Sequence, residues 1–536
     1  MSTPSTPQTE KPPRSDGDGR AIPAAIATLV GLLALAAALG VGHLLAGFIA
    51  PQSSPFVAVG DGFIRITPPF LLEFAKSTFG LNDKLVLNIG MGAIIALVAV
   101  VAGLVSRRSS RPGRAIFMVL GLVGLLAALT SPVFELLGMI APLGALVAGV
   151  GVFGWLHGLA LDAAGGSAGE PGRDAADRGG LSRRRLLMGT AVTAVGAAVA
   201  GAVGQLRFGS GGIEDSRQAI GALRPATPVP AVPAGADFAS LGTPTFITPN
   251  ADFYRIDTAN LLIPRTAAES WSMSIHGMVD RELKLTYADL MDRPLVEKTI
   301  TLTCVSNEIG GELISTSNFV GVPLRDLLME AGVQPGATQI FTTSEDGWTC
   351  GTPTDVVMEP DRGALLAIGM NGEPLPLEHG FPVRMVVPGL YGFVSATKWL
   401  ADMELTTFEA AQSYWLKRGW GEKAPIKTQS RIDKPKPFER VGAGKVTVAG
   451  VAWSQHRGID RVEVRADDGP WVVAELATEV STDTWRMWRA DLELGAGSHT
   501  LQCRSTDRTG ATQPVERVDP IPDGATGWHS VIMTAA

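Results

Sequence analysis

The run from residue 22 to residue 49 constrains the fold most, because it contains no Asp, Glu, Lys or Arg. At about 1.5 Å of rise per residue, a helix of this length crosses the roughly 30 Å hydrocarbon core of a bilayer. A surface helix of a soluble domain needs a charged or polar face, and this run has none. The sequence therefore predicts a membrane span here.

Four further apolar runs follow, at 85–105, 115–131, 139–160 and 186–204. The run 115–131 is close to the minimum length for a span, so the count is five spans, or four without it. The chain as a whole is 46% hydrophobic and 18% charged, and the apolar excess lies in its first two fifths. We expect a transmembrane region over 21–205, preceded by a disordered cytoplasmic tail over 1–20, which is rich in Ser, Thr, Pro and Asp.

Basic residues gather in two of the connecting loops. The loop 106–114 carries four arginines and the loop 161–185 carries five, whereas the turn between the third and fourth runs carries no Lys or Arg. Loops rich in Lys and Arg stay in the cytoplasm. With a cytoplasmic N-terminus, five spans then place the C-terminal half on the extracytoplasmic side of the cell membrane.

Ser182-Arg183-Arg184-Arg185-Leu186-Leu187 directly precedes the last, weakly hydrophobic span. This segment resembles a twin-arginine export signal placed inside the chain; a plain positive-inside anchor is the alternative. Because twin-arginine export carries folded proteins, it would suit an outer domain that receives a cofactor in the cytoplasm. Such a signal is read by a receptor and determines the route, not the fold.

Two histidines, His43 and His157, lie inside predicted spans and raise the question of a haem. Their expected depths differ by on the order of 10–15 Å, too far for the two axial ligands of one haem. We expect structural or interfacial roles for both, and no haem in this chain. The spans also lack the charged residues that a transporter or sensor usually needs. The membrane region is thus predicted to be an anchor, or a docking site for a separate redox partner.

The extracytoplasmic half divides into three parts. A Pro-rich linker covers 206–245, and the repeated prolines of 222–245 favour extended backbone that forms a stalk or a strap on the domain surface. Over 246–430, short strand-like runs at 271–277, 298–306, 339–347 and 382–389 alternate with helical stretches such as 287–291 and 324–331. This pattern indicates an α+β domain with a mixed sheet. Over 436–536 the pattern is all-β and predicts an immunoglobulin-like sandwich, with a hairpin at Asp468-Gly469.

Charge and cysteine content exclude several classes of protein. A net charge of −7 and a pI near 5.6 leave no broad basic surface for nucleic acid. Three scattered cysteines, Cys304, Cys350 and Cys503, cannot build a disulfide framework, a zinc ribbon or an iron–sulfur site. We expect Cys503 to pack in the sandwich core. Cys304 ends the β-branched run 299–303 before a Gly-rich loop, so it is either a core residue, the commoner case, or a metal-binding thiolate.

Three segments carry a family resemblance. The segment around Cys304, followed by Gly321-Val322-Pro323-Leu324, resembles the cysteine loop of the sulfite oxidase-type molybdopterin oxidoreductases. The segments 248–254 and 370–389 resemble two further motifs of that family, and all three keep the family's order within 245–535. The resemblance implies a molybdopterin-binding domain of sulfite oxidase type with a molybdenum-molybdopterin (Mo-pyranopterin) cofactor. It also implies a C-terminal dimerisation domain, compatible with a homodimer.

Carried over residue by residue, the resemblance makes Cys304 the molybdenum ligand. The implied pterin contacts are Asn250, Phe253, Tyr254, Thr343, His379, Arg384, Ser395 and Lys398. Arg and Lys suit an anionic phosphate, and a soft thiolate suits the metal. The alternatives are surface charges for Arg384 and Lys398, and core packing for Tyr254.

The chain departs from the family at the positions that bind the anionic substrate. Ile256 stands where an arginine is expected, and Arg255 comes one place early. A second arginine just past the cysteine is absent, because the stretch reads Asn307-Glu308-Ile309, and the tyrosine ahead of the Asn-Gly turn is missing from 367–370. A buried dianion such as sulfite needs paired charge, so we expect it to bind poorly. The candidates for the pocket around Cys304 are Asn307, Glu308, Trp348, Tyr391 and Arg418.

The sequence therefore predicts a membrane-anchored, extracytoplasmic molybdenum oxidoreductase that performs two-electron oxo transfer on a small substrate. Its electrons would pass to or from a separate quinone- or cytochrome-linked partner. Oxidation of a sulfite-like substrate and reduction of a sulfoxide or N-oxide both remain open, and the missing arginines favour reduction or an uncharged substrate. The alternative is a non-catalytic cell-surface protein that binds a partner through its immunoglobulin-like domain.

Overall fold

The computed structural model describes residues 21–536 apart from 69–70, 72–73, 76–77, 80–82, 132–133, 135, 166–172, 211 and 260–262. The predicted tail at 1–20 lies outside the described residues. The chain forms two compact units, a helical unit that ends at Ser210 and a second unit that holds nearly all the remainder. The two units are described separately.

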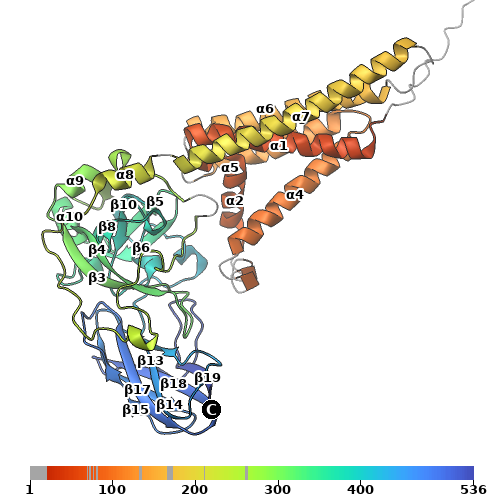
Figure 1. Cartoon of the computed structure of the whole chain (residues 1–536). Helices are drawn as coiled ribbons and strands as arrows, with labels where there is room; N and C mark the ends of the chain where they lie inside the picture. The colour runs from red at the N-terminus through yellow and green to blue at the C-terminus, as the bar shows by residue number, and fades with distance from the viewer. Residues whose placement is uncertain are drawn as a thin grey trace, which may run out of the picture. The chain divides into compact units, whose positions relative to one another are not determined.

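Long helices make up the helical unit (Figure 1). They are α1 (Ala24–Ile49), α4 (Asp83–Val105), α5 (Arg111–Leu129), α6 (Ile140–Gly165) and α7 (Arg173–Ser210), with the shorter α2 (Pro55–Ile66) and the 3₁₀ turns η1 (Pro51–Ser53) and η3 (Leu137–Met139). Five segments within the described residues are long and apolar enough to cross a membrane. This number agrees with the larger of the two predicted counts.

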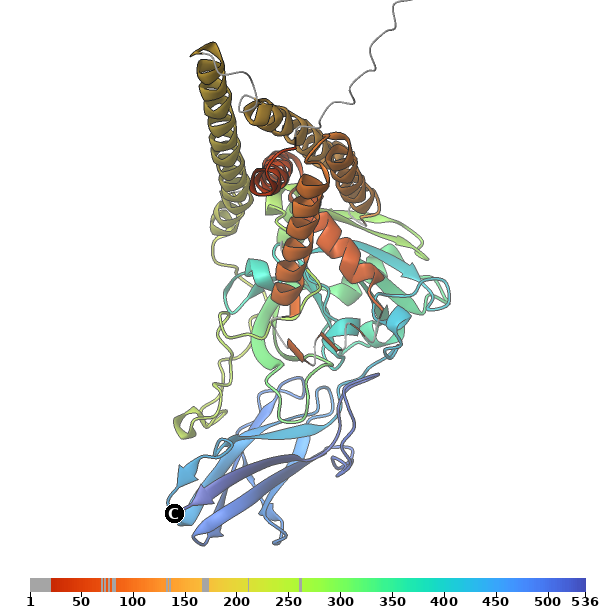
Figure 2. The ribbon, with the colours of Figure 1, turned by 90° about the vertical axis from the view of Figure 1, so that its right-hand side faces the viewer.

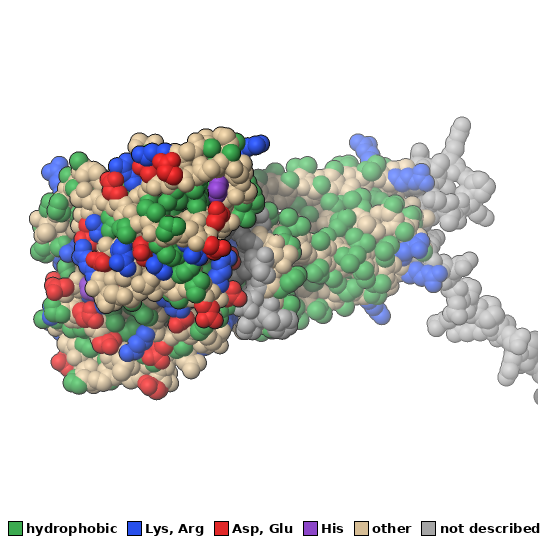
Figure 3. Space-filling view, turned by 90° about the horizontal axis from the view of Figure 1, so that it is seen from below, with side chains coloured by type: hydrophobic (Ala, Val, Ile, Leu, Met, Phe, Trp, Pro, Cys, Tyr) green, Lys and Arg blue, Asp and Glu red, His purple; other side chains and the backbone are tan. Residues whose placement is uncertain are grey.

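Close contact between backbones holds α1 against its neighbour α4. A Cβ added at Gly31 would overlap the carbonyl oxygen of Ala99, and one added at Gly103 would overlap that of Ala27. Such small-residue contacts are typical of helices that pack in membranes. Many large hydrophobic side chains of the unit are exposed, and on the face seen in Figure 3 they spread along it while Lys and Arg gather at one end.

Both histidines of the helical unit contact protein groups. Nε2 of His157 lies 2.6 Å from the carbonyl oxygen of Ser106. Nε2 of His43 lies 3.2 Å from Oε1 of Gln205, and its Nδ1 lies 3.4 Å from Oγ of Ser54. These contacts join neighbouring segments of the unit, and a purely structural role for both residues stays a prediction.

The second unit begins with α8 (Ile213–Ile220), where Ile213 is buried and Nε of Arg217 donates to the carbonyl of Leu375. The linker predicted over 206–245 is therefore helical in its first part, because an apolar side of α8 packs on the domain. The Pro-rich part then runs along the surface as a strap. It bonds to strand β3 (Val296–Thr303), where the amide of Glu297 donates to Thr227, and to the C-terminal domain, where the amide of Thr478 donates to Gly235.

Two sheets build the domain between the strap and residue 430, where a single mixed sheet was predicted. The first has the order β2 (Leu283–Thr286), β1 (Ser272–Gly277), β10 (Leu400–Thr406), β5 (Gln339–Ser344), β6 (Thr349–Pro353). The second has the order β3, β4 (Ile314–Pro323), β7 (Leu365–Met370), β8 (Glu373–Pro374), with β9 (Arg384–Val386) also on β7. Only the β1–β10 pair of these two sheets is parallel. The short helices are α9 (Tyr287–Met291), α10 (Leu324–Ala331) and α11 (Thr354–Val357), and the first two match the predicted ranges.

Two further sheets form the C-terminal domain (Figure 2). One has the order β11 (Gln429–Lys434), β13 (Gly444–Trp453), β17 (Arg486–Leu494), β16 (Glu475–Leu476). The other has the order β12 (Arg440–Val441), β19 (His529–Ala535), β18 (Gly497–Asp507), β14 (Ile459–Ala466), β15 (Val472–Val473). Their facing side chains share one core, in which Val448, Trp488, Val464 and Cys503 are fully buried. β14 and β15 pair as the hairpin expected at Asp468-Gly469.

Candidate active site at the end of strand β3

Cys304 directly follows β3 and opens a loop that returns to β4. Its amide donates to the carbonyl of Leu313 at 2.9 Å, and its carbonyl accepts from the amide of Asn307 at 3.0 Å. All three cysteines lie in the described part of the chain, and none forms a disulfide. Cys350 and Cys503 are fully buried, and burial raises the pKa of their thiols to about 11 and about 12. Cys304 is partly exposed, so it is the cysteine placed to meet a ligand.

An aromatic wall lies beside Cys304. Tyr254 stacks on Phe253 with ring centroids 5.4 Å apart, and Phe253 meets the rings of Phe319 and His379 edge-on at 6.2 and 5.3 Å. Burial raises the pKa of Tyr254 above its ordinary value; Cys304 raises it further, and Arg384 opposes the shift. The phenol of Tyr254 therefore lies within electrostatic range of both the thiol and the guanidinium.

Arg384 and His379 form the basic side of the site. Nη1 of Arg384 donates to the carbonyl of His379 at 3.1 Å, and Nε2 of His379 lies 3.1 Å from the carbonyl of Asn250. Burial is the main cause that lowers the pKa of Arg384 to about 10 and that of His379 to about 4. At neutral pH the guanidinium is charged and the imidazole is neutral.

Nε of Arg384 is buried and has no hydrogen-bond partner within the described ranges. An unsatisfied donor on a buried cation is costly, and an anion that bonds to it removes that cost. In the same part of the chain no three His, Cys, Asp or Glu side chains converge, so Cys304 would be a single protein ligand. The residues present thus fit a cofactor that brings its own metal ligands and an anionic group.

Lys398 is held in an ion pair. Its Nζ donates to Asp257 Oδ2 at 2.9 Å and to the carbonyl of Glu378 at 3.2 Å, and Arg255 donates to the same carboxylate oxygen at 2.8 Å. Burial lowers the pKa of Lys398 to about 8, and Asp257 opposes that shift. Arg255, one place early by comparison with the family, is therefore committed to Asp257.

Asn250 fastens its segment to the β7–β8 turn. Its Nδ2 donates to Glu373 Oε1 at 2.5 Å, and its Oδ1 accepts from Asn371 Nδ2 at 2.8 Å. Ser395 is fully buried and donates its hydroxyl to the carbonyls of Leu390 and Tyr391. These side chains hold the local backbone, so any contact of theirs with a cofactor remains a prediction.

Thr343 lies on β5, paired with Asp402 of β10 and Thr349 of β6. Within the described part of the chain, its hydroxyl forms no hydrogen bond that joins it to Cys304 or Arg384. Its contact with the cofactor stays a prediction from the family resemblance.

The pocket candidates fall into different surroundings. Tyr391 is buried, and Cys304 is among the groups that raise the pKa of its phenol, after burial itself. Asn307 is buried and accepts from the amide of Leu313 at 2.8 Å, which closes the loop, whereas Glu308 points to solvent. Arg418 stacks over the Tyr414 ring at 3.7 Å. Of these four, the structure associates Tyr391 and the loop residue Asn307 with Cys304.

Trp348 follows the turn after β5, and its amide donates to Asp346 Oδ1 at 3.1 Å. Its indole Nε1 is buried and has no partner within the described part of the chain. The place of Trp348 in the pocket around Cys304 therefore also stays a prediction.

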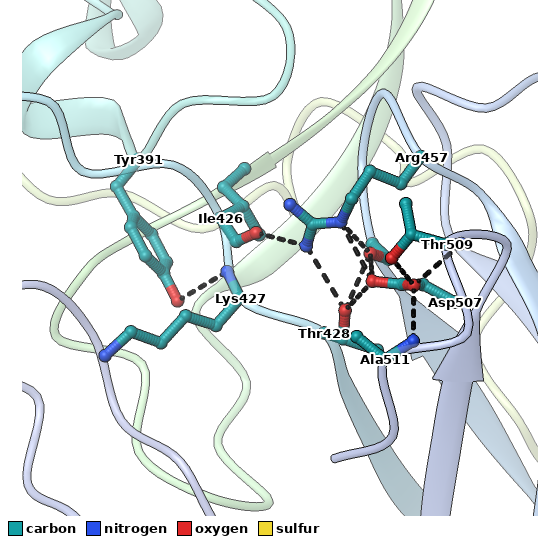
Figure 4. Close-up of polar contacts among 9 residues, drawn as sticks. Tyr391, Ile426, Lys427, Thr428, Arg457, Asp507, Thr509 and Ala511 are labelled. Carbon is teal, nitrogen blue, oxygen red and sulfur yellow. Dashed lines mark hydrogen bonds and ion pairs between the residues drawn. The ribbon is translucent and has the colours of Figure 1, made fainter.

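Arg457, in the turn between β13 and β14, was not among the predicted site residues. Figure 4 shows it beside Ile426 and Thr428, which flank Lys427, and the amide of Lys427 donates to the Tyr391 hydroxyl from a separate segment. Its Nε donates to Asp507 Oδ2 at 3.0 Å, its Nη2 donates to the carbonyl of Ile426 at 2.8 Å, and its charge acts on Tyr391. The sequence around Arg457 does not indicate that it lies near Tyr391, because Arg457 belongs to the C-terminal domain and Tyr391 to the preceding one.

Comparison with known proteins follows the same division of the chain. Residues 260–415 match the family model described as "Oxidoreductase molybdopterin binding domain", and residues 423–535 match "Mo-co oxidoreductase dimerisation domain". The mitochondrial sulfite oxidase of Homo sapiens is 32% identical over 341 residues, which cover 54% of this chain and 62% of that protein. The sulfite oxidase of Gallus gallus is 30% identical over 338 residues, which cover 53% of this chain and 72% of that protein. The chain belongs to the sulfite oxidase-type family of molybdopterin oxidoreductases.

Membership in the sulfite oxidase-type family confirms the resemblance, and with it the molybdenum-molybdopterin cofactor. Among solved structures, the sulfane dehydrogenase SoxCD of Paracoccus pantotrophus is similar, with 24% identity and a TM-score of 0.47 over 55% of this chain and 84% of that chain. The chain spans about three fifths of the length of the Homo sapiens relative. The long apolar helices lie outside both matched ranges.

Proposed function

We propose that this sulfite oxidase-type protein is a membrane-anchored molybdenum oxidoreductase that transfers an oxygen atom to or from a small substrate. One observation carries the proposal. Cys304 stands partly exposed at a strand end, with Tyr254 in electrostatic range of both its thiol and a buried arginine, Arg384, whose Nε lacks a partner in the described structure. A thiolate ligand and an unsatisfied buried cation are what a metal cofactor with an anionic tail requires.

The chain's own residues would divide the work as follows. Cys304 would hold the metal, Arg384 would bind the phosphate of the pyranopterin, and neutral His379 would contact the pterin. Phe253 and Tyr254 would keep water from one side of the cofactor. When bound, molybdenum supplies the two-electron redox chemistry.

Tyr391 is our candidate for the group that donates a hydrogen bond to the reacting oxygen of the substrate. Burial raises the pKa of its phenol above the ordinary value, so the hydroxyl keeps its proton at neutral pH. The oxygen accepts a weak 3.4 Å hydrogen bond from the amide of Lys427, which leaves the O–H free to donate. A hydrogen bond from this hydroxyl would stabilise charge on a substrate oxygen near Cys304.

The charges around the pocket favour a neutral substrate. Arg457 supplies a positive charge, but Asp507 pairs with it at 3.0 Å. Arg255 is paired with Asp257, and the positions of two family arginines hold Ile256 and the solvent-exposed Glu308. Neither Arg457 nor Arg255 is therefore left unpaired to bind a dianion. We infer an uncharged acceptor such as a sulfoxide or N-oxide, with oxidation of a small neutral donor as the reverse reaction.

We further propose that the five apolar helices cross the cell membrane and that the second unit faces the extracytoplasmic side. The amide of Ile22 donates to Arg107, and Nε of Arg107 donates to Ile22, so the start of α1 and the first basic loop lie at one end of the helical unit. That arrangement supports a cytoplasmic location for both. The C-terminal domain would have an immunoglobulin-like topology and would join two copies of the chain in a homodimer. A separate quinone- or cytochrome-linked protein would exchange electrons with the enzyme.

The export route has its own test. Replacing Arg183 and Arg184 together by Lys keeps the charge and removes the twin arginine. We expect the second unit of this variant to be protected from external protease in intact cells. The matched control, Arg107→Lys with Arg108→Lys, should expose it normally, and normal exposure of the twin-arginine variant would contradict this route.

Metal content tests the enzymatic proposal. The full chain, purified in detergent from a host that makes molybdopterin, should carry molybdenum and reduce sulfoxides or N-oxides with a reduced viologen dye as electron donor. Cys304→Ser should lose both properties. Cys503→Ser is the matched control, because Cys503 lies in the C-terminal core. Undiminished metal in Cys304→Ser would contradict the proposal, and no metal in the wild type would favour the non-catalytic alternative.

A further inference from the structure

The C-terminal domain holds the strand that leads into Cys304. Gln455, which is 1% exposed, donates from Nε2 to the carbonyl of Thr301 at 3.2 Å and to the hydroxyl of Thr303 at 3.1 Å. The amide of Thr301 donates to the carbonyl of Asp483 at 3.0 Å. The backbone immediately before the cysteine is therefore bonded to a different domain of the chain.

The same domain also holds the loop that leaves Cys304. Nη1 of Arg431 donates to the carbonyl of Gly311 at 2.6 Å. Gly310 has a φ of +79°, and a Cβ there would overlap the ring of His529, so the loop lies directly against that ring. Both contacts come from strands β11 and β19 of the C-terminal domain.

The groups that make these contacts are themselves fixed. Nε of Arg431 donates to Asp433 Oδ1 at 2.8 Å, and the two side chains are 6% and 14% exposed. Nδ1 of His529 accepts from the amide of Ile432 at 3.0 Å. A buried side chain that is bonded at both ends has little freedom to follow a moving loop.

We propose that the C-terminal domain positions the Cys304 thiol, with Gln455 fixing the strand before it and Arg431 the loop after it. This inference rests on the proposed function, in which Cys304 holds molybdenum. Gln455 and Arg431 are positioning residues that touch neither metal nor substrate. They give the C-terminal domain a role in the metal site of its own chain, separate from dimerisation.

The expected change in metal binding can be taken from other metal sites, in which neighbouring groups orient the metal ligands. Groups that orient a metal ligand typically change metal affinity by about 10- to 100-fold when they are removed. Without Gln455 the loop keeps its closing bond between Cys304 and Leu313, so the fold should survive. Removing Gln455 should therefore loosen the Cys304 loop and weaken metal binding without a comparable fall in the free energy of unfolding.

Gln455→Met tests the inference in the full chain, because it keeps the size of the side chain and removes the two donated bonds. The matched control is Gln429→Met, since Gln429 is 3% exposed in the same domain and donates to the carbonyl of Ala525 at 2.6 Å. In metal-free protein, amide exchange over 304–313 should be faster in Gln455→Met than in wild type or the control. In loaded protein, molybdenum should be lost roughly tenfold faster, and the thiolate-to-metal absorption band should shift.

The outcomes separate the two claims. Wild-type protein without molybdenum overturns the proposed function. Wild-type protein with molybdenum, together with unchanged exchange, metal retention and absorption band in Gln455→Met, overturns the positioning role alone. If Gln455→Met does not fold, the double variant Arg431→Met with Asp433→Leu decides, because it removes a buried ion pair whole and leaves no unpaired charge. The same three readouts should then change from the loop side.

Discussion

Nη1 of Arg384 donates to the carbonyl of His379 at 3.1 Å, while Nε of the same guanidinium is buried with no partner in the described structure. One half of the guanidinium thus holds the protein backbone and the other half remains available. This division suits a group that must stay in place before and after a phosphate binds.

Replacing Arg384 by Lys should therefore reduce cofactor content, although the charge is kept. A lysine cannot hold the His379 carbonyl and an anion in the same fixed geometry. Losing one hydrogen bond to a charged group costs about 1.5–3 kcal/mol, or roughly tenfold or more in affinity. Pterin fluorescence per mole of protein measures this. Arg325→Lys, which changes an arginine bonded to the carbonyl of Met358, should retain full content. Full pterin content in Arg384→Lys would exclude the phosphate role.

Tyr391→Phe should slow turnover and leave the metal in place. If the hydroxyl donates to the reacting oxygen, kcat should fall by roughly 100-fold, as when a single oxyanion donor is removed. Molybdenum per protein should stay at the wild-type value. Tyr287→Phe serves as the control, because that buried hydroxyl has no partner within the described ranges. Equal kcat in Tyr391→Phe and wild type would remove Tyr391 from the mechanism.

Stability should depend on pH through His379. Burial is the first cause, and Arg384 the second, that lowers its pKa from 6.5 to about 4. The unfolded chain therefore takes up a proton below pH 6.5 that the folded chain resists. Above pH 6.5 His379 is neutral in both states and the free energy of unfolding keeps its full value. As the pH falls from 6.5 to about 4, this group lowers the free energy of unfolding by on the order of 3 kcal/mol.

Thermal unfolding of the metal-free protein between pH 4 and 7 checks this dependence. His379→Gln keeps a donor for the Asn250 carbonyl and should flatten the slope of Tm against pH. His499 offers a contrast, because its hydrogen bond to Asp467 raises its pKa and so adds stability at low pH. His499→Gln should steepen the acid loss, and an unchanged slope in His379→Gln would show that other groups cause it.

Gly31→Ala should destabilise the helical unit. Its Cβ would overlap the backbone oxygen of Ala99, so α1 and α4 must move apart, at a cost of about 1–3 kcal/mol. Gly90→Ala in α4 is the control, since a Cβ there meets no described atom within 4 Å. Thermal unfolding in detergent should show a lower Tm for the first variant and no loss for the second. Equal melting of the two would mean that α1 and α4 do not pack closely in detergent.

Local sequence patterns predicted the elements better than their assembly. The helices Tyr287–Met291 and Leu324–Ala331 and most strands lie where periodicity and turn residues placed them. The division into two sheets could not be predicted, because it depends on the pairing of β1 with β10, two strands far apart in the sequence. The motifs around Cys304 and Arg384 identified the family. They gave no indication of Arg457, Gln455 or Arg431, whose importance lies in contacts between domains.

The Pro-rich strap has a consequence for the outermost strand of the second sheet. Thr227 forms a bridge with Val296 of β3, and the amide of Glu297 donates to Thr227. An uncovered strand of this kind is a template for another chain, and unpaired edges promote aggregation. A soluble fragment that began at residue 246 would lack this cover. Crystallisation or assay of the second unit is better served by a fragment that starts before α8, because the Pro-rich strap keeps the edge of its sheet from adding a foreign strand.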